Sequence, residues 1–318
     1  DGRLKPKPPD ADETDLRSST LPTAFGEKRA MRVFDPDVLV RSFEQLGFTK
    51  EDHETWNKMT SHPHGIIFVT GPTGSGKTTT LYSTLKQLAT SEVNVCTIED
   101  PIEMVEPSFN QMQIQANIDV DFAQGVKAML RQDPDIIMIG EIRDLQTADM
   151  AIQAALTGHL VLSTLHTNDA PSSVTRLIDL GVPPYMISAT VLGVMAQRLV
   201  RTLCPNCKAP SETDPQAWDE LVRPFKMKMP ETLYQPVGCL ECRGTGYRGR
   251  MGVYETMPLR TTLKNHITRG ADLETLTRAS LKSGMKPLRI SGAMKVAKGL
   301  TTIEEVMRVT PSQDILMG

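Results

Sequence analysis

The stretch Gly71-Pro72-Thr73-Gly74-Ser75-Gly76-Lys77-Thr78 follows the phosphate-loop pattern G-x-x-x-x-G-K-[ST]. An apolar, β-branched run at 66–70 precedes it, which is typical of a buried parallel strand. Residues 79–88 follow with leucines three and four positions apart, so these leucines share one face of a helix. The order strand, loop, helix predicts a binding site for a nucleoside triphosphate, formed by the whole stretch together with Thr79.

Each part of this loop has its own chemical role. Gly71, Gly74 and Gly76 let the chain turn with its N–H groups facing inward, where side chains would block an approaching phosphate. Lys77 can reach the β- and γ-phosphate oxygens, and Thr78 offers a hydroxyl group to Mg²⁺. The positive end of the following helix favours the same anionic ligand. We therefore expect the nucleotide to bind together with a magnesium ion.

Composition limits the classes of protein to consider. The chain has 318 residues and a formal net charge of −3. This length suffices for two or three structural units, and the charge gives no overall attraction to nucleic acid or anionic lipid. No apolar run approaches the ~20 residues that span a bilayer. Residues 1–9 also lack the apolar segment of a secretory signal.

Strand and helix patterns alternate from the phosphate loop onward. The predicted strands are 66–70, 94–99, 136–140 and 159–165, and the predicted helices between them are 78–90, 122–131 and 145–156. Such alternation predicts an α/β fold with a twisted, mostly parallel sheet that helices cover on both faces.

Outside this core the patterns are weaker. We expect strand-like pieces within 14–35, helices at 38–46, 51–59, 171–200 and within 258–309, and a polar, proline-containing loop at 211–236. In the last helical region, Thr302 is expected to cap a helix and Glu305 to answer it in a capping box.

Acidic residues follow two of the predicted strands, at the sheet edge where catalytic groups collect. Glu141 directly follows 136–140 and is suited to orient and deprotonate an attacking water; the alternative is a surface carboxylate paired with Arg143. Glu99 ends the strand 94–99 and is expected to contact the metal-bound or attacking water. Asp100 and Glu103 are expected only to shape the turn. So many carboxylates beside a nucleotide need a metal ion to neutralise them.

Two histidines flank the fourth predicted strand. His159 and His166 stand at its opposite ends, so they cannot both touch one phosphate. A lone histidine is usually packed or capped. His166 follows the strand at the edge of the phosphate loop and is the better candidate for sensing the γ-phosphate. We expect His159 to contact a neighbouring element or subunit.

Four of the five cysteines form two C-x-x-C pairs, Cys204 with Cys207 and Cys239 with Cys242. Turns of this spacing aim two thiolates at one point, and two such turns predict a closed, structural Cys₄ zinc site. A disulfide or a redox pair is the alternative. Cys96 is expected to be a buried strand residue.

Four segments together carry a family resemblance. GPTGSGKT (71–78), TIEDPIE (97–103), RQDPDIIMIGEIRD (131–144) and TGHLVLSTLHTNDA (157–170) resemble the Walker A, Asp, Walker B and His boxes of the ATPases of bacterial type II secretion and type IV pilus assembly. The resemblance covers nearly the whole chain, and the paired cysteines resemble the metal-binding insertion of the secretion and pilus-extension members.

This resemblance implies a RecA-like core and a ring of six subunits, with ATP or ADP held between the two domains of each subunit. Arginines must then stabilise the charge that develops as the γ-phosphate leaves. Arg17 and Arg32 match arginines of the family's second N-terminal domain and are our candidates; the alternative is that they are ordinary surface arginines.

The resemblance also implies a division of the chain. The expected parts are a remnant of the second N-terminal domain (1–36), a linker with helices (37–64), the RecA-like ATPase core (65–200), the Cys₄ metal module (201–252) and a helical subdomain (253–318). Because the family's chains are longer at the N-terminus, this chain is expected to begin inside that second domain.

The implied function is Mg²⁺-dependent ATP hydrolysis by a hexameric, cytoplasmic motor at the inner-membrane face. Its expected partners are further copies of itself and a membrane platform protein that adds pilin-like subunits to a fibre; no nucleic acid is expected. One alternative is an ATP-gated scaffold without significant turnover, which has no need of Glu141. Another is a RecA-like nucleic-acid motor, which needs a basic stripe with stacking aromatics. The shared motifs do not separate secretion from pilus assembly.

Overall fold

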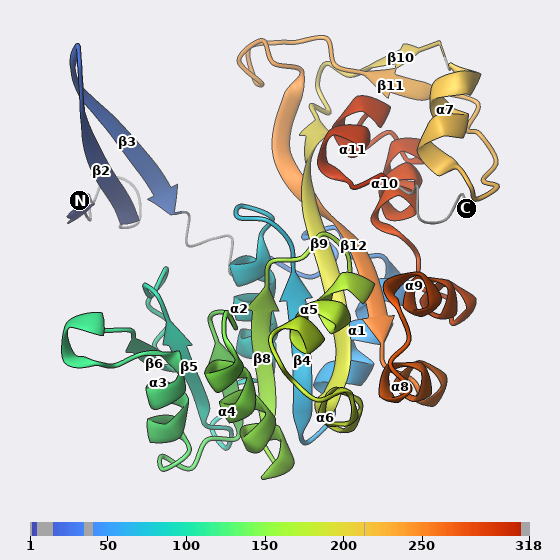
Figure 1. Cartoon of the computed structure of the whole chain (residues 1–318). Coiled ribbons are helices and arrows are strands. Elements are labelled where there is room, and N and C mark those ends of the chain that lie inside the picture. The colour runs from blue at the N-terminus through green and yellow to red at the C-terminus, as the bar shows by residue number, and fades with distance from the viewer. Residues whose placement is uncertain (1, 5–14, 35–40, 213, 313–318) are drawn as a thin grey trace.

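A seven-stranded sheet forms the centre of the computed structural model, which describes residues 2–4, 15–34, 41–212 and 214–312 (Figure 1). Its strand order is β12-β9-β4-β8-β7-β5-β6. The strands are β4 (Gly65–Thr70), β5 (Val95–Glu99), β6 (Asn110–Gln113), β7 (Ile136–Ile139), β8 (Leu160–Leu165), β9 (Val191–Leu203) and β12 (Tyr247–Pro258). Every neighbouring pair is parallel except β12 with β9 at one edge. The prediction of a mostly parallel α/β sheet is confirmed.

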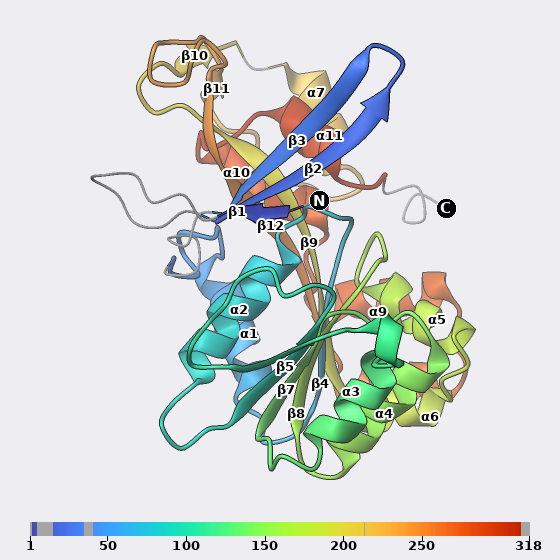
Figure 2. The ribbon, with the colours of Figure 1, turned by 90° about the vertical axis from the view of Figure 1, so that its left-hand side faces the viewer.

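Helices cover both faces of this sheet (Figure 2). On one face lie α1 (Lys50–Thr60) and α2 (Lys77–Leu88), and on the other lie α3 (Phe122–Met129), α4 (Leu145–Leu156), α5 (Pro171–Asp179) and α6 (Pro184–Thr190). Buried apolar side chains form two clusters that match this arrangement, with Trp56 and Leu81 in the first and Val126 and Val174 in the second. The predicted strands and helices of the core lie within about two residues of the observed ones, the usual uncertainty of element ends.

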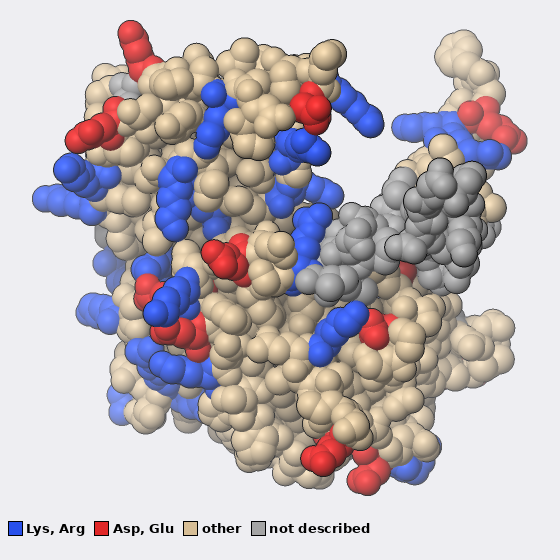
Figure 3. Space-filling model, turned by 180° about the vertical axis from the view of Figure 1, so that it is seen from behind, with Lys and Arg blue, Asp and Glu red and all other residues tan. Residues whose placement is uncertain are grey.

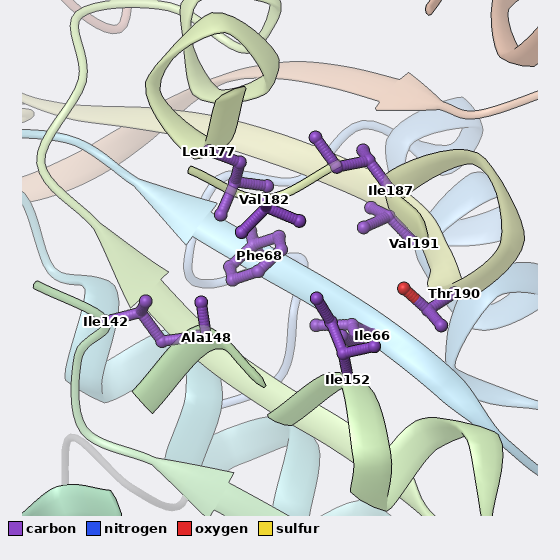
Figure 4. Close-up of a pocket in the computed structure, with 10 residues that line it drawn as sticks. All are labelled: Ile66, Phe68, Ile142, Ala148, Ile152, Leu177, Val182, Ile187, Thr190 and Val191. Atoms are coloured by element: carbon purple, nitrogen blue, oxygen red, sulfur yellow. The ribbon is translucent and has the colours of Figure 1, made fainter. Parts of the chain in front are cut away.

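The second cluster leaves a small apolar cavity between β4 and helices α4, α5 and α6 (Figure 4). Its free volume is only ≈ 10 Å³. Its lining includes Phe68 of β4, Ile152 of α4, Leu177 of α5 and Ile187 of α6. The sticks in Figure 4 converge on this space from the strand and from the helices. Because the lining is almost wholly apolar, a water molecule has too few partners to be held there.

The prediction of a helical region at 171–200 is wrong for its last part. After α5 and α6 the chain forms the strand β9, which pairs with β4 on one side and β12 on the other. These two ladders satisfy the backbone of β9, and its valines suit a strand better than a helix. At Gly193 a Cβ atom would lie 2.2 Å from the sulfur of Met59, so glycine allows α1 to pack closely on the strand.

Two further predictions need correction. The region 211–236 is not simply a loop, because it contains α7 (Pro215–Val222) and β11 (Leu233–Gln235), which pairs with β10 (Ala209–Ser211). The segment is mostly polar, yet Trp218 of α7 is buried with its indole N–H on the carbonyl of Met227. Of the predicted helix 38–46, residues 41–42 have no regular structure and residues 43–46 belong to a turn, which ends at Gly47 with a φ of +99°. Residues 38–40 lie outside the described part.

The N-terminal strands form a separate antiparallel sheet. It consists of β1 (Gly2–Leu4), β2 (Asp15–Thr23) and β3 (Gly26–Phe34), in the order β1-β2-β3. The prediction of strand-like pieces within 14–35 is therefore confirmed for the residues that the structure describes.

Up to residue 312, where the described part ends, four helices follow β12, as the periodicity within 258–309 predicts: α8 (Thr261–Thr268), α9 (Leu273–Lys282), α10 (Leu288–Ala297) and α11 (Ile303–Val309). Thr302 caps α11 by accepting a hydrogen bond from the N–H of Glu305. The Glu305 carboxylate does not complete the predicted capping box, because it accepts hydrogen bonds from Arg201 and Arg308 instead. Burial raises the pKa of Glu305, but the hydrogen bonds from these arginines outweigh it and lower the pKa to about 2. This cluster ties α11 to β9.

Surface charge is mixed on the face opposite that of Figure 1. Lys and Arg side chains are interspersed there with Asp and Glu side chains (Figure 3). Within the described residues, every helix is too short or too polar to span a bilayer.

Candidate functional site

The phosphate loop joins β4 to α2 in the conformation that its glycines predict. Gly71, Gly74 and Gly76 have φ values of +150°, +79° and +86°, which residues with a Cβ atom rarely adopt. Gly76 is the N-cap of α2, so the first helical N–H groups, which have no acceptor within the helix, face the loop. Such a concave set of backbone donors at a helix N-terminus is an anion site.

Strand β9 supports the loop from behind, which the sequence did not indicate. A Cβ atom on Gly71 would lie 2.5 Å from the carbonyl oxygen of Gln197, and one on Gly76 would lie 2.8 Å from its Nε2 atom. The Gln197 side chain is buried and donates to the carbonyl of Ser75 (2.9 Å). It also accepts from the Thr80 hydroxyl group of α2 (2.9 Å). Two of the three glycines are thus required by contact with β9 as well as by their φ angles.

Lys77 lies folded over the loop. Its Nζ donates to the carbonyls of Gly71 (2.7 Å) and Pro72 (3.1 Å), and the residue is only 9% exposed. Burial lowers the pKa of Lys77 to about 8, although the carboxylate of Glu141 opposes this shift. The Ser75 hydroxyl group beside it is buried and has no hydrogen-bond partner within the described residues. The Lys77 ammonium group is held only by carbonyls, and the Ser75 hydroxyl group is unpaired among the described residues. Both groups are therefore suited to bind a phosphate.

Glu141 and His166 come together at the carboxyl ends of β7 and β8. His166 Nε2 lies 3.4 Å from a carboxylate oxygen of Glu141. The other oxygen is in contact with Arg143, so the ion pair considered as the alternative exists beside the His166 contact. Burial, followed by the charge of Lys77, lowers the pKa of His166, whereas Glu141 opposes this shift. These mutual effects place Lys77, Glu141 and His166 in one electrostatic environment.

Glu99 ends β5 and is buried, with three side-chain donors around its carboxylate. It accepts from the hydroxyl groups of Tyr82 (2.6 Å) and Thr97 (2.7 Å) and from the amide of Gln111 (3.1 Å). Burial, and then the Glu99 charge, raise the pKa of Tyr82 well above its ordinary value. This network joins α2, β5 and β6 beneath the site. Contact of Glu99 with a metal-bound or attacking water stays a prediction.

The other predicted residues lie elsewhere. His159 precedes β8, at the end opposite His166, and its Nδ1 atom is 2.9 Å from the carbonyl oxygen of Ala154 in α4. Arg17 and Arg32 are directly paired in register on β2 and β3. Their side chains lie outside the described part of the structure, so their role at the site stays a prediction.

The four paired cysteines converge although they come from two distant turns. Their sulfur atoms all lie within 4.8 Å of one another, with Cys204 to Cys239 at 3.9 Å and Cys207 to Cys242 at 3.8 Å. These distances exclude disulfides, whose sulfurs are about 2.05 Å apart. They agree with the edge of about 3.8 Å that a tetrahedron with Zn–S bonds of about 2.3 Å has.

Backbone N–H groups around the cysteines favour the charged thiolate form that a metal needs, although burial outweighs this effect at Cys207 and raises its pKa to about 11. N–H groups of Cys239 and Gly246 point at the sulfur of Cys242 at 3.2 and 3.1 Å, and that of Gly238 at the sulfur of Cys207 at 3.3 Å. Burial raises the pKa of Cys242, but these two N–H groups contribute to lowering it to about 6. The donor set fits one tetrahedral metal ion with no open coordination position.

Comparisons with known proteins agree with this geometry. The family model described as type II/IV secretion system protein matches residues 1–308. The type IV pilus assembly ATPase TfpB of Acinetobacter baylyi is 64% identical over 98% of this chain and 53% of its own length. The type II secretion system ATPase E of Vibrio cholerae is 47% identical over 93% of this chain and 58% of its own length. The chain thus spans about half the length of these curated relatives.

Among solved structures, the pilus retraction motor PilT with bound ADP is similar in fold. Its TM-score is 0.68 at 25% identity, over 98% of this chain and 78% of that one. The ATPase DotB of Legionella pneumophila shares the fold with a TM-score of 0.65 at 21% identity, over 97% of this chain and 76% of that one.

Proposed function

Because this chain belongs to the type II/IV secretion system protein family, we propose that it hydrolyses ATP with Mg²⁺ as part of a hexameric motor. The observation that carries this proposal is the convergence of the phosphate loop with Glu141 and His166 at one edge of the sheet. A protein that only binds nucleotide does not need a carboxylate near the γ-phosphate, and this favours a motor over an ATP-gated scaffold.

The groups at this edge divide the work of phosphoryl transfer among them. The loop N–H groups and Lys77 bind the β- and γ-phosphates, for which Lys77 exchanges its two carbonyl partners for phosphate oxygens. The Thr78 hydroxyl group would hold a Mg²⁺ ion, which would neutralise charge on the phosphates when bound. Glu141 orients the attacking water and accepts its proton, and His166 holds the carboxylate in position. Arg17 and Arg32 of the N-terminal sheet would stabilise the charge that develops as the γ-phosphate leaves.

We propose that the motor serves type IV pilus assembly at the cytoplasmic face of the inner membrane. The relative that is 64% identical is named for pilus assembly, whereas the Vibrio cholerae relative named for type II secretion is 47% identical. The membrane contact would run through a platform protein rather than through a spanning helix of the described residues. The cysteine cluster would hold one structural Zn²⁺.

Replacement of Glu141 by Gln tests the proposal. Removing a general base of this kind lowers the rate of hydrolysis by about 10²–10⁴-fold, while nucleotide binding persists. Phosphate release gives the rate, and a fluorescent ATP analogue gives the affinity. Glu304→Gln, at an exposed position of α11, is the matched control.

Arg143→Gln separates the base from its ion-pair partner, because it leaves the carboxylate in place. The proposed role of Glu141 would be wrong if Glu141→Gln hydrolysed ATP as fast as the parent chain. A parent chain that binds ATP without turnover would favour the scaffold instead.

A further inference from the structure

A large cavity lies where the segment 44–50 meets β12 and α10. Its free volume is ≈ 680 Å³, which falls in the range of about 300–1,000 Å³ found for small-molecule pockets. Apolar side chains form part of its wall: Phe48, Met251, Met294 and Leu300. Lys50, His53, Lys295 and Lys298 bring positive or titratable groups to the same space, and Glu44 is the acidic residue of the lining. None of these residues belongs to the phosphate loop or to the Glu141–His166 pair.

Lys295 is the unusual member of this lining, since it is only 5% exposed. Its Nζ contacts the carbonyl of Gly47, and none of the ion pairs within the ranges that the structure describes includes Lys295. A buried ammonium group is stable only when it is paired or well hydrogen-bonded. Burial lowers the pKa of Lys295 to about 8, with the charge of Asp52 opposing this shift.

The acidic group whose charge opposes this shift already has other partners. The Asp52 carboxylate accepts from the Thr49 N–H (3.1 Å) and hydroxyl group (2.6 Å) and so closes the capping box at the start of α1. Lys298 lines the same cavity and adds a second positive charge, which further lowers the pKa of Lys295. The cavity therefore combines an excess of positive charge with polarisable apolar walls, which suits an anion that carries an apolar part.

We propose that this cavity binds a phosphorylated small molecule, with its phosphate on Lys295 and Lys298 and its apolar part against Met251 and Met294. The site is separate from the nucleotide site but is connected to it. The Tyr254 hydroxyl group donates to the carbonyl of Leu46 (2.8 Å) at the rim of the segment 44–50. The Trp56 indole N–H donates to the Thr84 hydroxyl group of α2 (3.0 Å). A ligand that holds this segment would thereby stabilise α1 against the helix that begins at the phosphate loop.

Pyrophosphate binding to the whole chain tests the proposal, with Lys77→Ala as background so that the phosphate loop contributes little. Equilibrium dialysis should show saturable binding in this background. Adding Lys295→Met should weaken it about tenfold or more, because a charge-assisted contact is lost. Adding Lys298→Gln, at an exposed position, should weaken it several-fold without disturbing the fold. Lys282→Met, exposed on α9 and outside the cavity, should leave it unchanged.

Two further arms identify the source of the phosphate. Adenosine monophosphate in dialysis tests for a free organic phosphate, and co-sedimentation with phosphatidylglycerol vesicles tests for a lipid headgroup; either, if dependent on Lys295 and Lys298, supports the site. The proposal would be overturned if the chains with Lys295→Met or Lys298→Gln added bound pyrophosphate as tightly as the Lys77→Ala chain does. Loss of all binding on Lys77→Ala alone would also overturn it, because the anion would then belong to the nucleotide site.

Discussion

Glu255 of β12 is a buried carboxyl group that joins two helices to the sheet. It is 4% exposed, and its oxygens accept from the N–H groups of Ala170 (2.7 Å) at the start of α5 and Leu288 (3.2 Å) at the start of α10. Burial is the main cause that raises the pKa of Glu255 from 4.5 to about 7, and Asp169 adds to it. The Ala170 N–H and the charge of Arg198 oppose this shift. We predict that Glu255→Gln removes a pH dependence of folding stability.

The raised pKa of Glu255 makes the folded chain less stable as the pH rises. A carboxyl group whose pKa is higher in the folded chain holds its proton more tightly there, so its contribution to stability is full below pH 4.5 and is lost as the pH rises through 7. With these two values, the free energy of unfolding falls by about 2.5 kcal/mol between pH 5 and pH 8 from this group alone. Glutamine does not titrate. Its amide N–H₂ cannot accept from Leu288, which costs about 1 kcal/mol at every pH.

Urea unfolding at pH 5 and pH 8 measures the effect. We expect Glu255→Gln to be less stable than the parent at pH 5 by about 0.5 kcal/mol and more stable at pH 8 by about 2 kcal/mol. Glu304→Gln, exposed on α11, is the matched control and should change stability little at either pH. A difference between parent and Glu255→Gln that stays constant within about 0.5 kcal/mol would refute the reasoning.

Other consequences are open to direct measurement. Leu177→Ala enlarges the apolar cavity of Figure 4 and should lower the free energy of unfolding by about 3 kcal/mol. The control Leu156→Ala, at an exposed end of α4, should change it by under about 1 kcal/mol. Equal losses for the two variants in urea unfolding would contradict the described packing. Metal analysis should find about one zinc per chain. Cys204→Ser should lose the zinc and lower the melting temperature, while ATP binding persists. A parent chain that is fully folded without metal would rule out the zinc site. ATPase activity per chain should rise with protein concentration as a ring assembles, and a constant specific activity over the assembly range would count against a ring motor.

Local sequence carries most of the core and of the nucleotide site. The phosphate loop, Glu141 and His166 could be placed because a parallel sheet brings its carboxyl strand ends to one edge, so spacing along the chain becomes neighbourhood in space. Gln197 could not be found in this way. It acts through a strand that follows two helices, and valines and leucines on their own fit a buried helix as well as a buried strand.

The same limit explains the partners of two acidic residues. Glu305 stands where a capping box expects it, but Arg201, over a hundred positions earlier, takes its carboxylate because β9 and α11 are adjacent in the fold. Glu99 was recognised as a strand-end acid, yet its donors on α2 and β6 depend on how these elements pack. Only the tertiary arrangement decides such competition between a local partner and a distant one.

Strand β9 gives the molecule a mechanical connection between its two chemical centres. The strand supports the phosphate loop at Gln197 and leads without a break into Cys204, about 23 Å further along at 3.3 Å per residue. It is paired with β12 from Gly193 to Arg201 and again at Leu203, with one irregularity in register between these two stretches. A displacement of the phosphate loop at Gln197 would therefore be expected to shift the backbone that leads along β9 to Cys204.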